Sequence, residues 1–380
     1  MKYQHKVISC CLIMIVLLSC FASCAPKHES QTGISKEYTE TPSTDQSEVN
    51  SNDLPYTFDT EQPNEIELSA FSRLSEAFGG PDVRVEYDLG HSAGVLPFDQ
   101  LPIYQTNSSV YVQNRTDSEL KTANDNFDKW IACFDNSVSL DSEKETGALV
   151  RKTVNGVEVS SRVFDIFALR VPMLSAKKVD WFSPSEEDIL YEVEHNEFVK
   201  AACKYQEISN PDIAMVTTVF SQEGEAAIYS WEARIWQKSE DKFEEILNRS
   251  FRSVTLHGEI KPEQDTEKFF VLMIQTGKAS IVEESVPVIS PEDAFEQVLK
   301  GKQAKTGALF AGGGEPQLTR ENCVAVRMSY RFDVVPNGHI SGIYIPCYEF
   351  YFNCVENTAE KPSQTMLVLP ACNLYAKPAE

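Results

Sequence analysis

The sequence predicts an α+β fold of two successive units, each an antiparallel sheet with one main helix on a face. Alternating apolar segments flank short turn sequences, most clearly Asn155-Gly156 and Asn337-Gly338, and this is the pattern of antiparallel hairpins. A helix start of the Ser-Pro type also occurs once in each half of the pattern. The order strand, helix, antiparallel strands therefore appears twice, at residues 160–280 and 281–380.

The N-terminus has the layout of a secretory signal. Residues 1–6 contain two lysines, and the apolar run at 7–18 is shorter than the roughly 20 residues that a membrane span needs. Cys20 follows Leu-Leu-Ser and Cys24 follows Phe-Ala-Ser, and both sites resemble the lipobox of bacterial lipoproteins. We expect a signal peptide at 1–19 and lipid attachment at Cys20, with Cys24 as the alternative. A plain secretory signal and an uncleaved short anchor stay open.

The segment after the signal is strongly polar. Residues 20–54 are expected to form a disordered tether, because so few apolar side chains cannot offset the entropy of ordering the chain. The whole sequence carries a net charge of −23, which argues against nucleic-acid binding. The expected contacts are the membrane, through the lipid anchor, and an envelope or membrane protein.

Residues 55–159 are expected to form an N-terminal α+β region. Apolar residues at helical spacing predict a helix at 64–78 that ends at Gly79-Gly80. The other elements expected in this part of the chain, including the hairpin strands around Asn155-Gly156, are a helix at 117–134 and strands at 83–89, 109–113, 148–154 and 157–171.

The first sheet-plus-helix unit spans residues 160–280. Ser183-Pro184-Ser185-Glu186 has the pattern of a capping box and predicts a helix that continues to about Tyr205. Trp231 and Trp236 stand an odd number of residues apart on one strand, so they face opposite sides, and we expect one in the core and one exposed. The strands expected in this unit are 213–220, 226–237, 252–257 and 269–275.

The second unit spans residues 281–380. Ser290-Pro291-Glu292-Asp293 predicts another helix, which runs to Lys300 and ends at Gly301. The strands expected here are 286–289, 324–335, 341–352 and 366–374.

The amino-acid sequences of residues 286–301, of Met328-Ser-Tyr-Arg and of residues 345–352 resemble those of PepSY-like extracytoplasmic domains. They are similar in particular to those of the Yyc-type accessory regulators of a cell-wall sensor kinase. The resemblance implies a helix packed on a sheet and a regulatory role without catalytic residues. Those regulators usually keep one transmembrane helix, whereas the apolar run of this chain ends at a lipobox.

Several motifs are incomplete. Ser175-Ala-Lys-Lys178 and Lys305-Thr-Gly307 are fragments of a serine acylase pattern whose middle Ser-x-Asn is missing, and Gly312-Gly-Gly314 lacks the residues of a phosphate loop. Residues 135–141 resemble the start of a calcium loop, but Leu140 and Thr146 replace its Gly and Glu. We therefore predict no catalytic, cofactor-binding or metal-binding residue. The scattered histidines are expected to be solvated or capping: His91, His195, His257 and His339.

The cysteines beyond the signal leave two alternatives. One disulfide among the last four is permitted in an exported protein, and buried thiols are the other possibility. These cysteines are Cys133, Cys203, Cys323, Cys347, Cys354 and Cys372.

The sequence favours a non-enzymatic binding or regulatory lipoprotein on the extracytoplasmic side of the cell membrane. An envelope hydrolase with dispersed acidic residues is one alternative. A solute-binding lipoprotein is another, although such receptors are usually built from parallel βαβ lobes and these strands are joined by hairpins.

Overall fold

The computed structural model has mixed α and β structure with antiparallel sheets, in agreement with the predicted α+β class. The structure describes residues 56–59, 83–90, 98–106, 117–146, 149–163, 166–177, 184–220, 228–260, 269–275, 279–301, 317–332, 342–354 and 364–376. The predicted signal peptide, both candidate lipid sites and the predicted tether lie outside these residues, as do the helix predicted at 64–78 and the strand predicted at 109–113.

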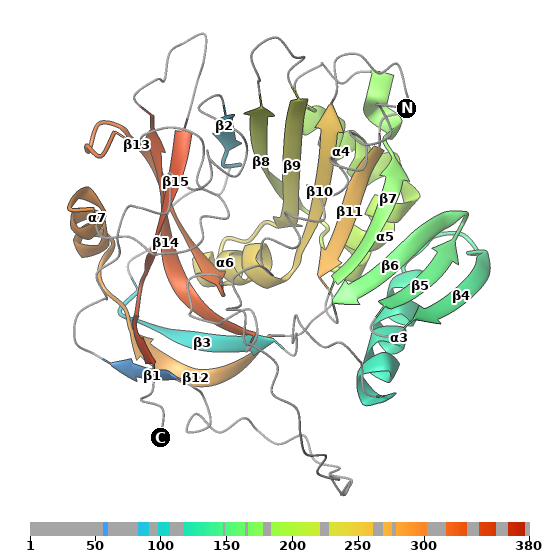
Figure 1. Ribbon diagram of the computed structural model, residues 1–380, viewed down its shortest axis with the longest axis horizontal. Helices are drawn as coiled ribbons and strands as arrows, with labels where there is room; N and C mark the ends of the chain where they lie inside the picture. The colour runs from blue at the N-terminus through green and yellow to red at the C-terminus, as the bar shows by residue number, and fades with distance from the viewer. Residues whose placement is uncertain are drawn as a thin grey trace, which may run out of the picture. The chain divides into compact units, whose positions relative to one another are not determined.

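The first sheet, called the large sheet, joins nine antiparallel strands in the order β2-β8-β9-β10-β11-β7-β6-β5-β4. Figure 1 shows β7 to β11 side by side, with β6, β5 and β4 continuing the sheet. Its strands are β2 (Val83–Asp88), β4 (Leu140–Thr146), β5 (Leu149–Val154), β6 (Val157–Val163), β7 (Ile166–Pro172), β8 (Pro211–Phe220), β9 (Ile228–Gln237), β10 (Ser253–Ile260) and β11 (Phe269–Gln275).

The hairpin predicted at Asn155-Gly156 is confirmed. β5 and β6 pair up to the turn, and both turn residues have positive φ, 47° and 78°. The single strand predicted at 157–171 is wrong, because β6 and β7 are separate strands that pair with each other. Val159 lies opposite Leu169, and the buried residues of β6 and β7 keep the same alternating phase, so the alternation does not reveal that there are two strands.

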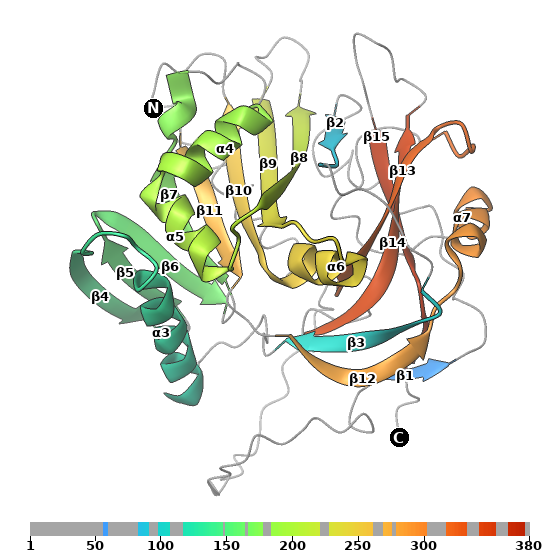
Figure 2. The same cartoon turned by 180° about the vertical axis from the view of Figure 1, so that it is seen from behind.

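Helices cover one face of the large sheet. α3 (Asp117–Ile131) corresponds to the helix predicted at 117–134, and α4 (Glu186–His195) and α5 (Glu197–Tyr205) follow later in the chain. Their apolar side chains form one buried cluster with the strands. Figure 2 shows α4 and α5 in front of the central strands.

The single helix predicted up to Tyr205 is interrupted at Asn196. This residue is extended (φ −81°, ψ 116°), ends α4 and caps α5, because its side chain accepts a hydrogen bond from the Phe198 N–H. The Asn196 amide also donates to the Pro172 carbonyl (3.1 Å) and to Glu192 (2.9 Å). These tertiary contacts stabilise the break.

The predicted start of this helix is also displaced. The cap of α4 is Ser185 rather than Ser183, because Asp188 stands three residues after Ser185. The Ser185 hydroxyl accepts from the Asp188 N–H, and the Asp188 carboxylate accepts from the Ser185 N–H, which completes a capping box.

The second sheet, called the small sheet, has the order β12-β3-β14-β13, with β15 also paired to β14. The antiparallel pairing of β13 with β14 confirms the hairpin strands predicted at 324–335 and 341–352, while the turn at Asn337-Gly338 lies outside the described residues. Its strands are β3 (Gln100–Thr106), β12 (Ala279–Pro287), β13 (Cys323–Arg331), β14 (Ile343–Asn353) and β15 (Gln364–Pro370).

The single strand predicted at 366–374 is wrong. β15 belongs to the small sheet, whereas β16 (Asn373–Ala376) pairs with β1 (Tyr56–Asp59). The chain bends at Ala371 and Cys372, and this bend directs it from the small sheet into the separate two-stranded sheet of β1 and β16.

The helix predicted after Ser290 is confirmed as α7 (Pro291–Leu299). The Ser290 hydroxyl accepts from the Asp293 N–H, Pro291 occupies the first turn, and Gly301 follows the helix with a φ of 77°. Helix α6 (Lys242–Phe251) was not predicted.

Sheet membership does not follow the expected order of regions. β2 and β3 come from the expected N-terminal region at 55–159, yet β2 pairs with β8 in the large sheet and β3 pairs with β12 and β14 in the small sheet. Local periodicity predicts that a strand forms but not its distant partner. In the described part of the chain, no helix is long and apolar enough to cross a membrane.

Candidate functional site at the junction of the two sheets

Helix α6 joins the two sheets. It contacts β9 and β10 of the large sheet and β13 of the small sheet, and both views show it between them. The Asp241 carboxylate begins the helix by accepting from the Phe243 and Glu244 N–H groups at 2.9 and 3.1 Å. Such a short helix depends on its buried face for stability, and that face contains Glu245, Ile246, Asn248, Arg249 and Phe251.

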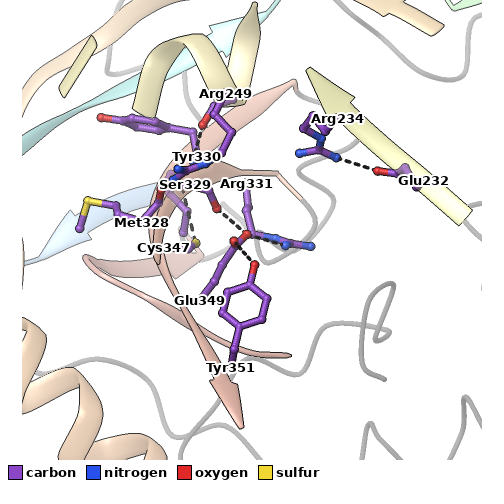
Figure 3. Close-up of polar contacts among 12 residues, drawn as sticks. Glu232, Arg234, Arg249, Met328, Ser329, Tyr330, Arg331, Cys347, Glu349 and Tyr351 are labelled. Carbon is purple, nitrogen blue, oxygen red and sulfur yellow. Dashed lines mark hydrogen bonds and ion pairs between the residues drawn. The ribbon is translucent and has the colours of Figure 1, made fainter. Parts of the chain in front are cut away.

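Side chains of α6 complete the edge of the small sheet. β13 is an edge strand, so part of its backbone has no strand partner. The Tyr330 N–H donates to the Ser250 hydroxyl (3.0 Å), and Arg249 Nη2 donates to the Met328 carbonyl, as Figure 3 shows for the arginine. The helix therefore satisfies backbone groups that a neighbouring strand would otherwise bond.

The same helix is bonded to the end of β9. Trp236 Nε1 donates to the Glu245 carboxylate, which also accepts from the Ser239 N–H at 2.7 Å. Asn248 Nδ2 donates to the Gln237 carbonyl at 3.1 Å. We call Trp236, Glu245, Arg249, Arg327, Ser329, Arg331, Glu349 and Tyr351 the junction.

The tryptophan prediction is corrected here. Trp231 and Trp236 belong to opposite faces of β9, but neither is exposed, with 2% and 0% of their surface accessible. Trp231 packs in the cluster beneath α4 and α5. Trp236 lies on the opposite face of β9, and it is buried because α6 covers that face at the end of the strand.

Glu349 is the central acceptor of the junction. Its Oε1 accepts from Ser329 Oγ (2.6 Å) and Arg331 Nη1 (3.0 Å), and its Oε2 accepts from Tyr351 Oη (3.0 Å), as Figure 3 shows. Burial by itself would raise the pKa of Glu349, but the surrounding arginines and the Ser329 hydroxyl outweigh it and lower the pKa to about 2. The carboxylate is therefore ionised at neutral pH.

Two further arginines stack against Trp236. The guanidinium of Arg327 lies 5.4 Å from the centre of the indole ring, and that of Arg249 lies 5.9 Å from it. Burial and the neighbouring Arg327 lower the pKa of Arg249 to about 10, so it stays charged at neutral pH.

Arg327 is incompletely bonded. It is 4% exposed, and its Nε and Nη2 atoms are buried without a hydrogen-bond partner among the described residues. A buried donor without a partner costs free energy, so its presence at a charged junction requires an explanation.

Beside the junction, the large sheet has a half-exposed polar surface. We call Ser230, Glu232, Arg234, Thr255 and His257 the contact face. His257 lies opposite Glu232 and Thr255 lies opposite Arg234 across the β9–β10 pairing. Figure 3 shows the Arg234–Glu232 ion pair on β9, with 3.4 Å between the paired atoms.

The contact face contains a serine–histidine pair. Ser230 Oγ lies 3.4 Å from His257 Nε2. A nucleophile relay also needs an acid that orients the histidine, and the described ion pair of the Glu232 carboxylate is with Arg234. The arrangement fits a polar contact surface better than a nucleophile relay.

The motif fragments found in the sequence have other roles in the described structure. Ser175, in the short helix η4 (Leu174–Lys177), is 1% exposed, and its N–H donates to Glu192 at 2.7 Å. Lys305-Thr306-Gly307 and Gly312-Gly313-Gly314 lie outside the described residues. Asp135, from the calcium-like segment, pairs with Lys200 and Lys204 at 3.1 and 3.5 Å.

The described histidines lie on different elements, and Cys347 and Cys372 pack in one buried cluster. His195 Nδ1 lies 3.0 Å from the Tyr191 carbonyl, while His91 and His339 are outside the described residues. Cys347 donates its S–H to the Ile345 carbonyl. Within the described ranges, no three His, Cys, Asp or Glu side chains are placed to hold a metal ion. Free thiols are carried by Cys133, Cys203, Cys323, Cys354 and Cys372.

Sequence reasoning missed the junction. Arg327 and Glu349 are charged residues within strands rich in apolar residues, and such a position suggests a buried, paired charge. Asp241, followed by Glu244 and by apolar residues at helical spacing, is the corresponding signal for α6. Neither signal identifies the partner across the two sheets.

Comparisons with known proteins do not assign this site. No protein-family model matches the chain, and no curated protein matches it significantly.

Proposed function

We propose that this chain is an extracytoplasmic membrane lipoprotein with a non-enzymatic binding or regulatory role in the cell envelope, and that the contact face meets its partner. The observation that carries the binding role is the difference between the two faces of the large sheet. One face is buried beneath helices, whereas the contact face keeps both signs of charge half-exposed beside the junction.

The physical argument concerns rigidity. Polar groups bind a partner with less loss of entropy when their backbone is already ordered. β9 and β10 lie inside the large sheet, and the end of β9 is bonded to α6 by Trp236 and Gln237. The contact face is thus part of a fixed framework rather than a loop.

The proposed location depends on the N-terminal sequence. The short apolar run and the Leu-Leu-Ser-Cys20 site support lipid attachment at Cys20, with Cys24 as the alternative. The amino-acid sequence of residues 286–301 and 345–352 supports the more specific proposal that the chain contains two PepSY-like units, similar to accessory regulators of a sensor kinase.

Intact mass and peptide mapping of the mature chain after membrane extraction test the location. We expect a diacylglyceryl-modified Cys20 at the N-terminus. Cys20→Ala should abolish lipidation and release the chain from the membrane, whereas the matched Cys24→Ala should retain both. An unmodified N-terminus, or a chain that retains residues 1–24, contradicts the lipoprotein proposal.

A photo-crosslinking amino acid at Thr255 tests the contact face in membranes. We expect one dominant adduct that Arg234→Glu strongly reduces, because the substitution reverses the charge of the surface. Arg320→Glu is the control, since Arg320 is exposed and pairs with Glu296 away from this face. Equal adduct yields in the two variants would exclude the contact face.

A further inference from the structure

Arg327 presents an unusual arrangement of donors. The Nε and Nη2 atoms lie on the same edge of a guanidinium group and donate in parallel, which is the geometry that binds both oxygens of a carboxylate. These are the two atoms of Arg327 that are buried without a partner among the described residues. The side chain therefore contains a complete bidentate donor set that no described group uses.

The nearest strand partner does not fill this donor set. Glu349 lies directly opposite Arg327 in the β13–β14 register. Its two oxygens nevertheless accept from Ser329, Arg331 and Tyr351. Arg327 affects Glu349 only through the field of its charge.

The charges of the junction are also unequal. Its three arginines are Arg249, Arg327 and Arg331, and its carboxylates are Glu245 and Glu349. Arginines therefore outnumber carboxylates among these five side chains. A water molecule could accept from one donor but would add no negative charge.

We infer that the Arg327 edge is a binding site for a carboxylate-bearing ligand or partner group. The site deepens the proposed binding role, on which it rests, by naming the chemical class that it takes. A carboxylate presents two oxygens that match the parallel Nε and Nη2 donors of Arg327. Because the two nitrogens are covered, the ligand enters when neighbouring side chains move.

The test uses the full chain in non-ionic detergent, with trifluoroacetate as the probe and ¹⁹F NMR as the readout. We expect saturable line broadening that acetate reverses and that an equal concentration of chloride does not. Trifluoroethanol, a neutral probe of similar size, should stay sharp. Broadening that does not saturate, or that chloride reverses equally, shows an adventitious ion only and overturns the site. More effective competition by inorganic phosphate than by acetate overturns the assignment to a carboxylate.

Arg327→Lys locates the probe, because it retains the charge and removes the parallel donors. We expect at least a tenfold weaker apparent affinity, while the exposed control Arg320→Lys stays unchanged. Equal affinity in Arg327→Lys overturns the inference. If that variant does not fold, Trp236→Phe replaces it, since it removes the indole beside the guanidinium. At least a threefold change in affinity then supports the site, and no change overturns it.

The proposed function and the proposed carboxylate site at Arg327 can be refuted independently of each other. A chain that binds the probe but has an unmodified N-terminus refutes the lipid anchor and leaves the anion site. A lipidated chain that crosslinks through the contact face but does not bind the probe refutes the anion site alone.

Discussion

Two buried glutamates are held by different donors in two regions of the molecule. Under α4, Glu192 is 0% exposed and accepts from the Ser175 N–H (2.7 Å) and from the Asn196 amide (2.9 Å). At the junction, Glu349 is 8% exposed and accepts from Arg331 and two hydroxyl groups. The described donors to Glu192 are neutral, whereas Glu349 lies among buried cations.

The difference shows how each region tolerates a charge. In the helix-covered region, backbone and amide dipoles at the start of α5 and in η4 stabilise a single carboxylate. At the junction, the carboxylate of Glu349 and the arginines of α6 and β13 compensate one another's charge. Substitution of Glu349 should therefore reduce the folding stability more than substitution of Glu192.

The largest effect is expected for Glu349→Ala. The substitution leaves the junction arginines buried without their carboxylate, and breaking such a buried pair costs about 3–5 kcal/mol. Urea unfolding at neutral pH measures the loss. The matched control is Glu296→Ala, which breaks the exposed pair with Arg320 and should cost less than about 1 kcal/mol. Similar losses in the two variants would contradict a charge-compensating role for Glu349.

Acid should weaken the junction next. The pKa of Glu349 is lowered from 4.5 to about 2, so its contribution to stability is complete above pH 4.5 and is lost as the pH falls through about 2. A shift of this size corresponds to on the order of 3 kcal/mol. Urea unfolding at successive pH values should show this loss, and Glu349→Gln should remove that part of the pH dependence. An unchanged acid profile in Glu349→Gln would exclude Glu349 as its source.

The smallest effect is expected for Glu192→Gln. The amide retains one acceptor oxygen but turns an NH₂ group toward a donor, which costs about 1–3 kcal/mol. The same urea experiment measures it at neutral pH. A loss equal to that of Glu349→Ala would show that neutral donors and arginines compensate a buried carboxylate equally well, and the comparison would no longer hold.

Much of the secondary structure could be predicted from local patterns. The turn at Asn155-Gly156 and the start of α7 at Ser290 depend on neighbouring residues, and both are confirmed. The break at Asn196 could not be predicted from local patterns, because the Asn196 side chain donates a hydrogen bond to the carbonyl of Pro172 on a distant strand. The split between β6 and β7 was hidden because the buried residues of the two strands keep the same alternating phase.

The sequence by itself determined the α+β class and the antiparallel hairpins, because each of these depends on periodicity or on neighbouring residues. The tertiary structure alone decided that β2 and β3 join different sheets and that α6 connects them. It also decided that Arg249 of α6 lies beside Arg327 and Glu349 of the β13–β14 hairpin, about 80 to 100 positions later in the chain. The physical reason is that pairing and charge compensation act between groups close in space, and no local pattern records which distant residues those will be.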